Sequence, residues 1–171
     1  MAAFLFLIRS RIAHVEKTNV MRLLDAKSIS YEAREYDPEI TSGPLVAAAL
    51  DEDPDCVFKT LVTEGPKKEH FVFVIPVNAE LDLKKAAKAA HVKSIAMIHQ
   101  KELLPLTGYV HGGCSPFGMK KAFPTFLDET AELFESIFVS GGRRGYQVGV
   151  SPADILSYCD GSYADLTVGT F

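Results

Sequence analysis

The sequence predicts a single α+β domain in which strand hairpins and separate helices share one core. The chain has 171 residues, of which 47% are hydrophobic and 23% are charged, and this composition suits one folded domain. Runs rich in β-branched and aromatic residues come in adjacent pairs joined by polar turns. Helical segments stand between these pairs without a regular β-helix-β alternation, which indicates the α+β class.

The first third of the chain carries two helix signals and one strand signal. Thr18 is a suitable cap for a helix over 18–27, where apolar residues recur at helical spacing. Alternating apolar and polar residues predict a half-exposed strand over 29–36. Pro44 suits the first position of a short alanine-rich helix that ends at Leu50.

Signals of the same kinds predict two hairpins and two further helices in the rest of the chain. A polar turn with Gly65 separates two strand-like runs, and a glycine-rich tip separates two others. Ser151 followed by proline matches the start of a helix. The predicted elements are a hairpin of 56–63 with 71–77, a helix from the cap Asp82 to Ala90, a strand over 94–98, a helical turn over 100–104, a strand over 123–127 interrupted by Pro124, a hairpin of 136–140 with 146–150, and a helix over 152–159.

The charge balance limits what the surface can bind. Eighteen basic residues against 22 acidic ones give a formal charge of −4, so the surface as a whole does not attract nucleic acid. Any contact with RNA is therefore expected to be local. The basic groups available for it, each also a normal solvated surface feature, are Lys67-Lys68, Lys84-Lys85 with Lys88, Lys120-Lys121 and Arg143-Arg144.

Cysteine usage and the N-terminus argue against several classes of protein. Cys56, Cys114 and Cys159 are odd in number and far apart, with no histidines at ligand spacing, so we expect neither a disulfide framework nor a metal site. The apolar segment 1–8 is far shorter than the roughly 20 residues that span a bilayer, and no basic residue precedes it. We expect a cytoplasmic protein, in which 1–16 is an extra edge strand, a wrongly chosen start or a disordered extension.

Lys59 is the strongest candidate for chemistry. In a strand over 56–63 it shares one face with Val57 and Leu61, so an ammonium group stands in an apolar run. An unpaired charge is costly in such surroundings. The aliphatic part of the Lys59 side chain therefore either carries the ammonium group to the surface or places it in a cleft.

Two glycine-bearing segments are further candidates, because glycine leaves backbone amides open to a bound carbonyl, hydroxyl or phosphate. In 107–118, Gly113 and Gly118 have the spacing of a phosphate loop, but the Met-Lys-Lys that follows lacks the required lysine and hydroxyl arrangement. The alternative is an ordinary glycine-rich turn. The segment 140–145 adds two arginines. They either bind phosphates or are solvent-exposed residues at the tip of a hairpin.

His111 and Cys114 lie three residues apart, a spacing that raises the possibility of a thiol and imidazole pair. Such pairs are normally brought together by the fold and not by local sequence. A packing role is therefore the favoured interpretation of both residues.

These segments, with 17–24 and 81–87, resemble the YbaK/EbsC family of aminoacyl-tRNA deacylases over roughly 17–168. The likeness is strongest to the bacterial Cys-tRNA(Pro) deacylases, stand-alone relatives of the editing domain of prolyl-tRNA synthetases. It implies one domain over 17–171, with flanking helices and a mixed, mostly antiparallel sheet curled like a barrel around a pocket. No single motif is specific, and the order and spacing of the motifs carry the resemblance.

The resemblance implies an enzyme that removes misattached cysteine from tRNA(Pro), with the substrate thiol attacking its own ester and with no cofactor or metal. Lys59 is the implied catalytic group, which anchors the aminoacyl-ribose end. The implied partners are the 3′ end of aminoacyl-tRNA and prolyl-tRNA synthetase. The implied substrate-binding residues are Tyr36, Thr60, Gly112, Gly113, Ser115, Ser140, Gly141, Gly142, Arg144 and Gln147.

Two departures from the family pattern keep alternatives open. Gln147 stands where the Cys-tRNA(Pro) deacylases carry an acidic residue. The connection 36–43 is shorter, with Ser42 in place of an aromatic residue. The alternatives are a non-catalytic module that binds aminoacyl-tRNA or a nucleotide, and a deacylase of the same fold that is specific for alanine or serine.

Overall fold

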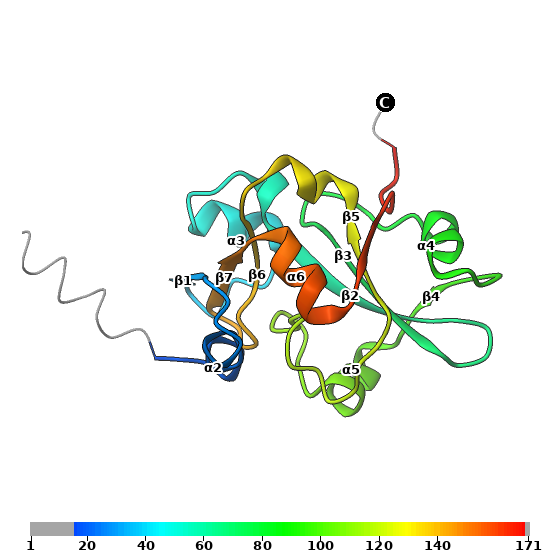
Figure 1. The fold of residues 1–171 in the computed structure, drawn as a ribbon, viewed down its shortest axis with the longest axis horizontal. Coiled ribbons are helices and arrows are strands. Elements are labelled where there is room, and N and C mark those ends of the chain that lie inside the picture. The colour runs from blue at the N-terminus through cyan, green and yellow to red at the C-terminus, as the bar shows by residue number, and fades with distance from the viewer. Residues whose placement is uncertain (1–15, 170–171) are drawn as a thin grey trace, which may run out of the picture.

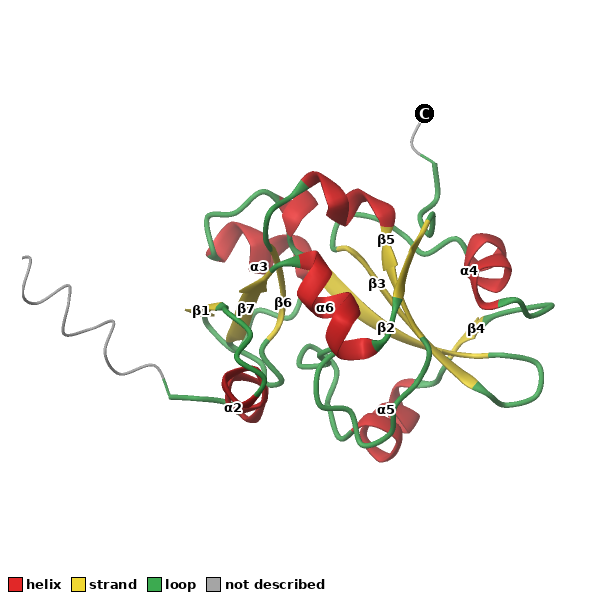
Figure 2. Cartoon of the chain, in the orientation of Figure 1, coloured by secondary structure: helices red, strands yellow, loops and turns green. Residues whose placement is uncertain are grey.

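The chain folds into two β-sheets with helices packed around them (Figures 1 and 2). The structure is a computed structural model that describes residues 16–169. Within them lie a three-stranded sheet, a five-stranded sheet and five α-helices. The predicted N-terminal extension 1–16 lies outside the described residues except for its last residue.

The three-stranded sheet has the order β1-β7-β6 and is antiparallel throughout. Glu32 in the first of these strands lies opposite Gly149, so an early strand closes on a late one. The predicted early strand and the predicted second hairpin are both confirmed. The three strands are β1 (Glu32–Glu35), β6 (Ile137–Ser140) and β7 (Tyr146–Val150).

The five-stranded sheet has the order β4-β2-β3-β5-β8. β2 and β3 form the predicted hairpin, and β5 and β8 then add to it in parallel. Parallel neighbours need long connections, which here contain helices. The strands are β2 (Phe58–Glu64), β3 (His70–Pro76), β4 (Ala96–Met97), β5 (Thr125–Asp128) and β8 (Ser162–Ala164).

The predicted helices are all present, and three begin at the caps that the sequence indicates, Thr18, Asp82 and Ser151, the first two with side-chain hydrogen bonds. The hydroxyl of Thr18 accepts the N–H of Met21, and the carboxylate of Asp82 accepts two N–H groups of the following turn. The helical turn over 100–104 continues to Thr107, and Gly108 ends it in the left-handed conformation. The helices are α2 (Asn19–Ala26), α3 (Gly43–Ala49), α4 (Leu83–Ala90), α5 (Gln100–Thr107) and α6 (Pro152–Cys159).

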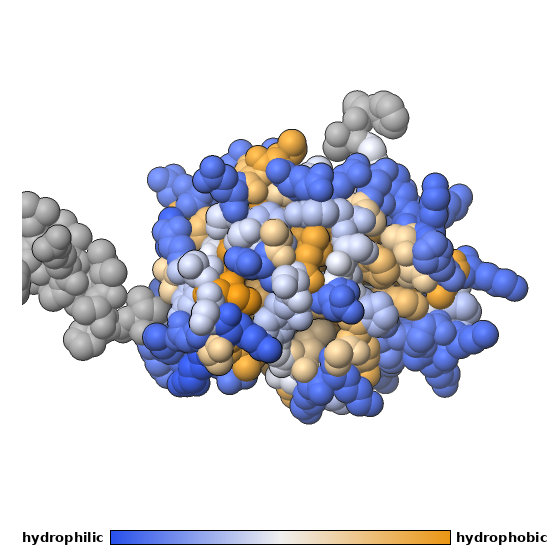
Figure 3. Space-filling view, in the orientation of Figure 1, coloured by the Kyte–Doolittle hydropathy of each residue, from blue (hydrophilic) through white to orange (hydrophobic). Residues whose placement is uncertain are grey.

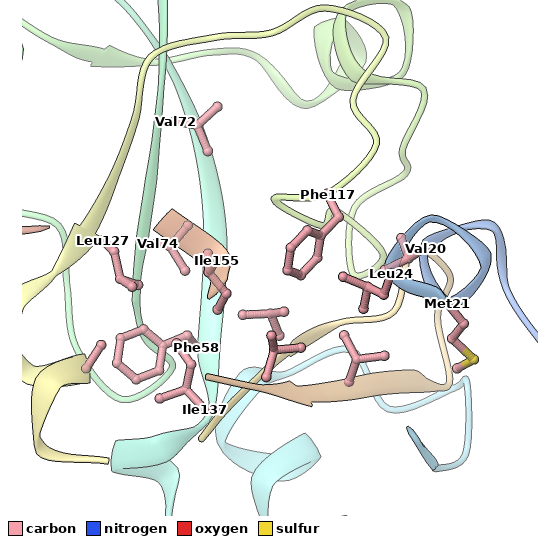
Figure 4. Close-up of a cluster of buried hydrophobic side chains, with 14 of the residues drawn as sticks. Val20, Met21, Leu24, Phe58, Val72, Val74, Phe117, Leu127, Ile137 and Ile155 are labelled. Atoms are coloured by element: carbon pink, nitrogen blue, oxygen red, sulfur yellow. The ribbon is translucent and has the colours of Figure 1, made fainter. Parts of the chain in front are cut away.

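One apolar core connects both sheets with α2 and α6 (Figure 4). Leu24, Phe58, Phe117, Ile137 and Ile155 meet there, each at most 2% exposed. Burying a side chain of this size contributes about 1.5–3 kcal/mol. Because the residues come from five separate segments, the core fixes the relative position of the elements that line the site.

The sheets do not form the single curled, barrel-like sheet that the family resemblance implies. In the described chain, β2 and the small sheet are linked by one isolated bridge, between Val57 and Phe138, and no strand closes a ring. The arrangement is mixed, and antiparallel pairs outnumber parallel ones, as expected. β8 and the 3₁₀ turn Glu129–Leu133 were not predicted, because both are short and β8 in addition depends on pairing with the distant β5.

The face of the molecule in Figure 3 is mainly hydrophilic, with apolar residues in small patches between charged ones. Within residues 16–169, no helix is long and apolar enough to cross a membrane. No group of three or more His, Cys, Asp or Glu side chains in the same residues is placed to hold a metal ion.

Candidate functional site

Six of the predicted site residues line a cavity of about 320 Å³ beside β2. Five consecutive residues, 57–61, line it, so the cavity extends around both faces of that strand. The other lining residues come from the end of β1, the loop before α3, α3 itself, the end of β3, α5, the loop after α5, and the β6–β7 hairpin. The full lining is Tyr36, Thr41, Gly43, Val46, Val57, Phe58, Lys59, Thr60, Leu61, Val77, Leu103, His111, Gly112, Cys114, Ser140 and Gln147.

Lys59 lies in the strand wall of this cavity, opposite Ile75 of β3. Burial lowers the pKa of Lys59 from its usual value, and the charge of Glu80 offsets part of that effect. Across residues 16–169, Lys59 makes no salt bridge. Its ammonium is therefore available to an oxygen atom of a ligand, in a position where water screens the interaction only in part.

Two polar atoms of the cavity lack hydrogen-bond partners. In the described part of the chain, Thr60 Oγ1 and Gln147 Oε1 are the only buried side-chain nitrogen or oxygen atoms without one. Buried polar groups are almost always paired, and leaving one unpaired costs about 1–3 kcal/mol. Both residues line the same cavity, so we expect a ligand to supply the missing partners.

The small sheet fixes the opposite side of the cavity. Ser140 of β6 lies across the hairpin from Gln147, and its hydroxyl accepts the N–H of Gly142 at 3.1 Å. The backbone N–H of Tyr36 donates to the carbonyl of Gly145 at 2.9 Å, which holds Tyr36 at the end of β1. Hydrogen bonds to backbone groups of the β6–β7 turn thus position both Ser140 and Tyr36.

The two glycine-bearing segments pack directly against each other. Arg144 Nε donates to the carbonyl oxygen of His111 at 2.8 Å. A Cβ atom on Gly113 would come within 3.2 Å of the backbone nitrogen of Arg144. Glycine at this position therefore lets two backbones touch, and the contact holds Gly112 and His111 at the cavity.

Six of the eleven predicted site residues line the cavity, and five do not. Ser115 is fully buried and its hydroxyl accepts the N–H of Phe117, so it offers nothing to the pocket. Gly142 has φ +94 and packs on Val20, which explains the glycine without a ligand. The residues outside the lining are Gly113, Ser115, Gly141, Gly142 and Arg144.

Several lining residues carry no signal in the sequence as site residues. Thr41 and Leu103 are ordinary loop and helix residues, and only the fold brings them to Lys59. His111 and Cys114 both line the cavity, although the sequence favours a packing role for them. Burial raises the pKa of Cys114 to about 12, so its thiol stays protonated near neutral pH and is a poor nucleophile.

Known proteins provide independent comparisons. Residues 37–158 match the family described as "Aminoacyl-tRNA editing domain". A protein of Enterococcus faecalis (strain ATCC 700802 / V583), named "Putative Cys-tRNA(Pro)/Cys-tRNA(Cys) deacylase EbsC", is 46% identical over 154 residues, which are 89% of this chain and 94% of that protein.

Two solved structures share the fold. One, described as "a putative trans-editing enzyme for prolyl tRNA synthetase", has a TM-score of 0.78 at 23% identity and covers 91% of this chain and 100% of its own. The other, "hypothetical protein APE2540", has a TM-score of 0.81 at 19% identity and covers 88% and 100%. Identities this low show a shared fold alone.

Proposed function

Because the chain belongs to the aminoacyl-tRNA editing domain family, we propose that it cleaves the ester between a misattached small amino acid and the 3′-terminal ribose of a tRNA. The favoured substrate is cysteine on tRNA(Pro), in line with the name of the Enterococcus relative. The catalytic domain is proposed to extend over 17–171. The observation that carries the proposal is Lys59, an ammonium without an ion-pair partner in a small cavity of the described chain.

Lys59 is proposed to hold the aminoacyl-ribose end and to stabilise negative charge that develops on its oxygen atoms. A fixed positive charge is worth more in a partly buried site than in water, because it needs no reorganisation during the reaction. The cavity, at about 320 Å³, is at the small end of the range for ligand pockets and suits a small amino acid. Backbone amides near Gly112 and Ser140 complete the proposed site.

The nucleophile is proposed to be the thiol of the substrate itself. Its thiolate sulfur would attack the ester carbonyl carbon, and the bond from that carbon to the ribose oxygen would break. The ribose oxygen then takes up a proton, and the amino acid leaves as a cyclic thioester. A protonated Cys114 in the cavity makes the protein a poor source of this nucleophile.

The proposed partners are the 3′ end of aminoacyl-tRNA and a prolyl-tRNA synthetase. The formal charge of −4 predicts weak binding to free tRNA. A synthetase that holds the same tRNA would raise its effective concentration at the site.

The experiment is a deacylation assay on one tRNA(Pro) charged separately with cysteine, serine, alanine or proline. We expect cysteine to be released at least about ten-fold faster than serine, because a few per cent of a thiol but almost none of a hydroxyl is ionised near pH 7. Alanine should be slower still. Equal rates for alanine and cysteine would indicate direct attack by water. Faster release of alanine or serine than of cysteine would indicate the alanine-specific or serine-specific alternative, and binding without any turnover would indicate a non-catalytic module.

A further inference from the structure

The cavity is unusual in its charge. Lys59 is its one lysine or arginine, and no aspartate or glutamate lines it in the part of the chain that the structure describes. The other titratable lining side chains are Tyr36, His111 and Cys114. Glu80 acts on Lys59 from outside the lining and offsets only part of the effect of burial.

The surroundings of Gln147 add no free negative charge. Its cross-strand neighbour on β1 is Arg34, which shares its face of the sheet. Arg34 is already engaged by Glu32 at 2.7 Å and by Glu52 at 3.1 Å. Within residues 16–169, these two carboxylates are paired with Arg34 and neither lines the cavity, so neither is placed to neutralise a second cation there.

Gln147 is only 6% exposed, yet its Oε1 atom has no donor, and the same holds for Thr60 Oγ1. A carboxamide oxygen accepts hydrogen bonds, and a threonine hydroxyl can accept or donate one. The cavity therefore offers two polar positions suited to N–H donors beside an existing positive charge. A ligand ammonium would be repelled by Lys59, whereas a neutral amine would supply the donors without that cost.

On the basis of the proposed function, we infer that Gln147 and Thr60 bind the α-amino group of the aminoacyl substrate in its uncharged form, which makes Gln147 a specificity-determining residue. A carboxylate at this position would instead select the ammonium form. The uncharged form is accessible, because an α-amino group titrates at about 7.7–8.0. An uncharged acceptor such as glutamine therefore suits a cavity that already contains the positive charge of Lys59.

The test uses two probes that the enzyme cannot hydrolyse. One is 3′-cysteinylamino-3′-deoxyadenosine, in which an amide replaces the ester, and the other is its counterpart that lacks the α-amino group. Calorimetry on the full chain should show the amine-bearing probe binding about 10-fold or more tightly, because only it satisfies the two polar positions. Equal affinities would overturn the inference.

Gln147→Met removes the acceptor and keeps the volume of the side chain. We expect this variant to lose the preference for the amine-bearing probe while its melting temperature stays at or above that of the wild type, since an unpartnered polar atom has been removed. Gln100→Met is the matched control, because Gln100 is exposed at the start of α5 and outside the cavity. A Gln147→Met variant that retained the full preference would contradict the assignment.

The charge state is tested by the ratio of the two affinities between pH 6 and 8.5. Changes in the protein's own charge with pH, including that of Lys59, affect both probes and largely cancel in the ratio. For the wild type, the preference for the amine-bearing probe should grow about 10-fold or more with rising pH, as the amine loses its proton. Gln147→Glu should reverse this trend. A wild-type ratio independent of pH would overturn the inference.

The outcomes separate this inference from the proposed function. Release of cysteine from tRNA without any preference between the probes would refute the role of Gln147 and leave the deacylase intact. A protein that neither releases an amino acid nor binds either probe would refute the proposed function, and the inference with it.

Discussion

Two cavities among residues 16–169 differ in what lines them, and the larger of the two is the weaker candidate for a ligand site. The second cavity, of about 610 Å³, lies beside α4 and the start of the 3₁₀ turn after β5. It is lined by five carboxylates and one lysine, whereas the 320 Å³ cavity is lined by one lysine and no carboxylate. The carboxylates of the second cavity are Asp55, Glu80, Asp128, Glu129 and Asp165.

The polar groups of the two cavities also differ in their partners. In the larger cavity, Lys85 contacts Asp165 at 3.0 Å and the carbonyl of Thr167 at 2.8 Å. Asp128 accepts hydrogen bonds from Leu166 and Thr130. In the smaller cavity, and within residues 16–169, Lys59 forms no salt bridge and two buried polar atoms have no hydrogen-bond partner. Unsatisfied groups, more than volume, therefore identify the surface that a ligand completes.

The sharpest test of this contrast replaces the lysine of each cavity. Lys59→Ala should lower kcat/KM for aminoacyl-tRNA by about 10²-fold or more, as the loss of one preorganised electrostatic donor does. Lys85→Ala is the matched control and should change kcat/KM by less than about two-fold, because the partners of Lys85 are within the protein. Deacylation kinetics with circular dichroism as a check of folding measure both. Near-normal turnover by a folded Lys59→Ala protein would remove Lys59 from the mechanism.

Asp128 tests the claim that the larger cavity has a structural role. Its carboxylate is 1% exposed and holds the backbone N–H of Leu166 next to β8. Asp128→Ala should lower the free energy of unfolding by about 2–4 kcal/mol, because it leaves buried donors unpaired. Asp128→Asn keeps an acceptor oxygen and should lose less. Urea denaturation measures the change, and unaltered stability in Asp128→Ala would contradict this role.

The pH dependence of catalysis should report the burial of Lys59. Burial disfavours the charged form and lowers its pKa, so the ammonium is lost at a lower pH than in an exposed lysine. We expect kcat/KM to fall as pH rises through that lowered pKa, after correction for spontaneous ester hydrolysis. The same burial destabilises the fold below the lowered pKa, and the penalty disappears as pH rises to the unfolded value. A rate that stays constant up to the pKa of a normal lysine would contradict this account.

Of these substitutions, the replacement of Cys114 should have the smallest effect on kcat/KM. Its thiol lines the candidate cavity but has a pKa raised by burial to about 12, so near neutral pH it contributes packing and no nucleophile. Cys114→Ala should change kcat/KM by less than about two-fold and should be insensitive to thiol reagents at this position. An inactive but folded variant would instead implicate Cys114, with His111 as its base.

The sequence predicted the helices and hairpins well because their signals are local. Thr18 and Asp82 cap their helices with side chains three residues or fewer from their donors. The separation into two sheets was not predictable in this way, since it depends on pairings such as Val72 of β3 with Thr125 of β5. Such pairings leave little trace in local hydrophobic patterns.

The same distinction holds for the candidate site. Lys59 and Gln147 were found because a charged residue in an apolar strand and a departure from a family pattern are visible in the sequence. Thr41 and Leu103 were missed because their place in the cavity depends on how α3 and α5 pack. Gly113 and Ser115 illustrate the opposite error, because a glycine-rich loop looks the same whether it meets a ligand or another backbone.

The pairing of β1 with β7 also bears on how the protein is made. Glu32 leaves the ribosome long before Gly149, its partner in the small sheet. Translation adds about 5–20 residues per second, so the delay is on the order of ten seconds. During this time β1 lacks β7, its neighbour in the three-stranded sheet. We therefore expect the nascent chain to complete the candidate pocket only after β7 has been synthesised, and β1 to need protection until then.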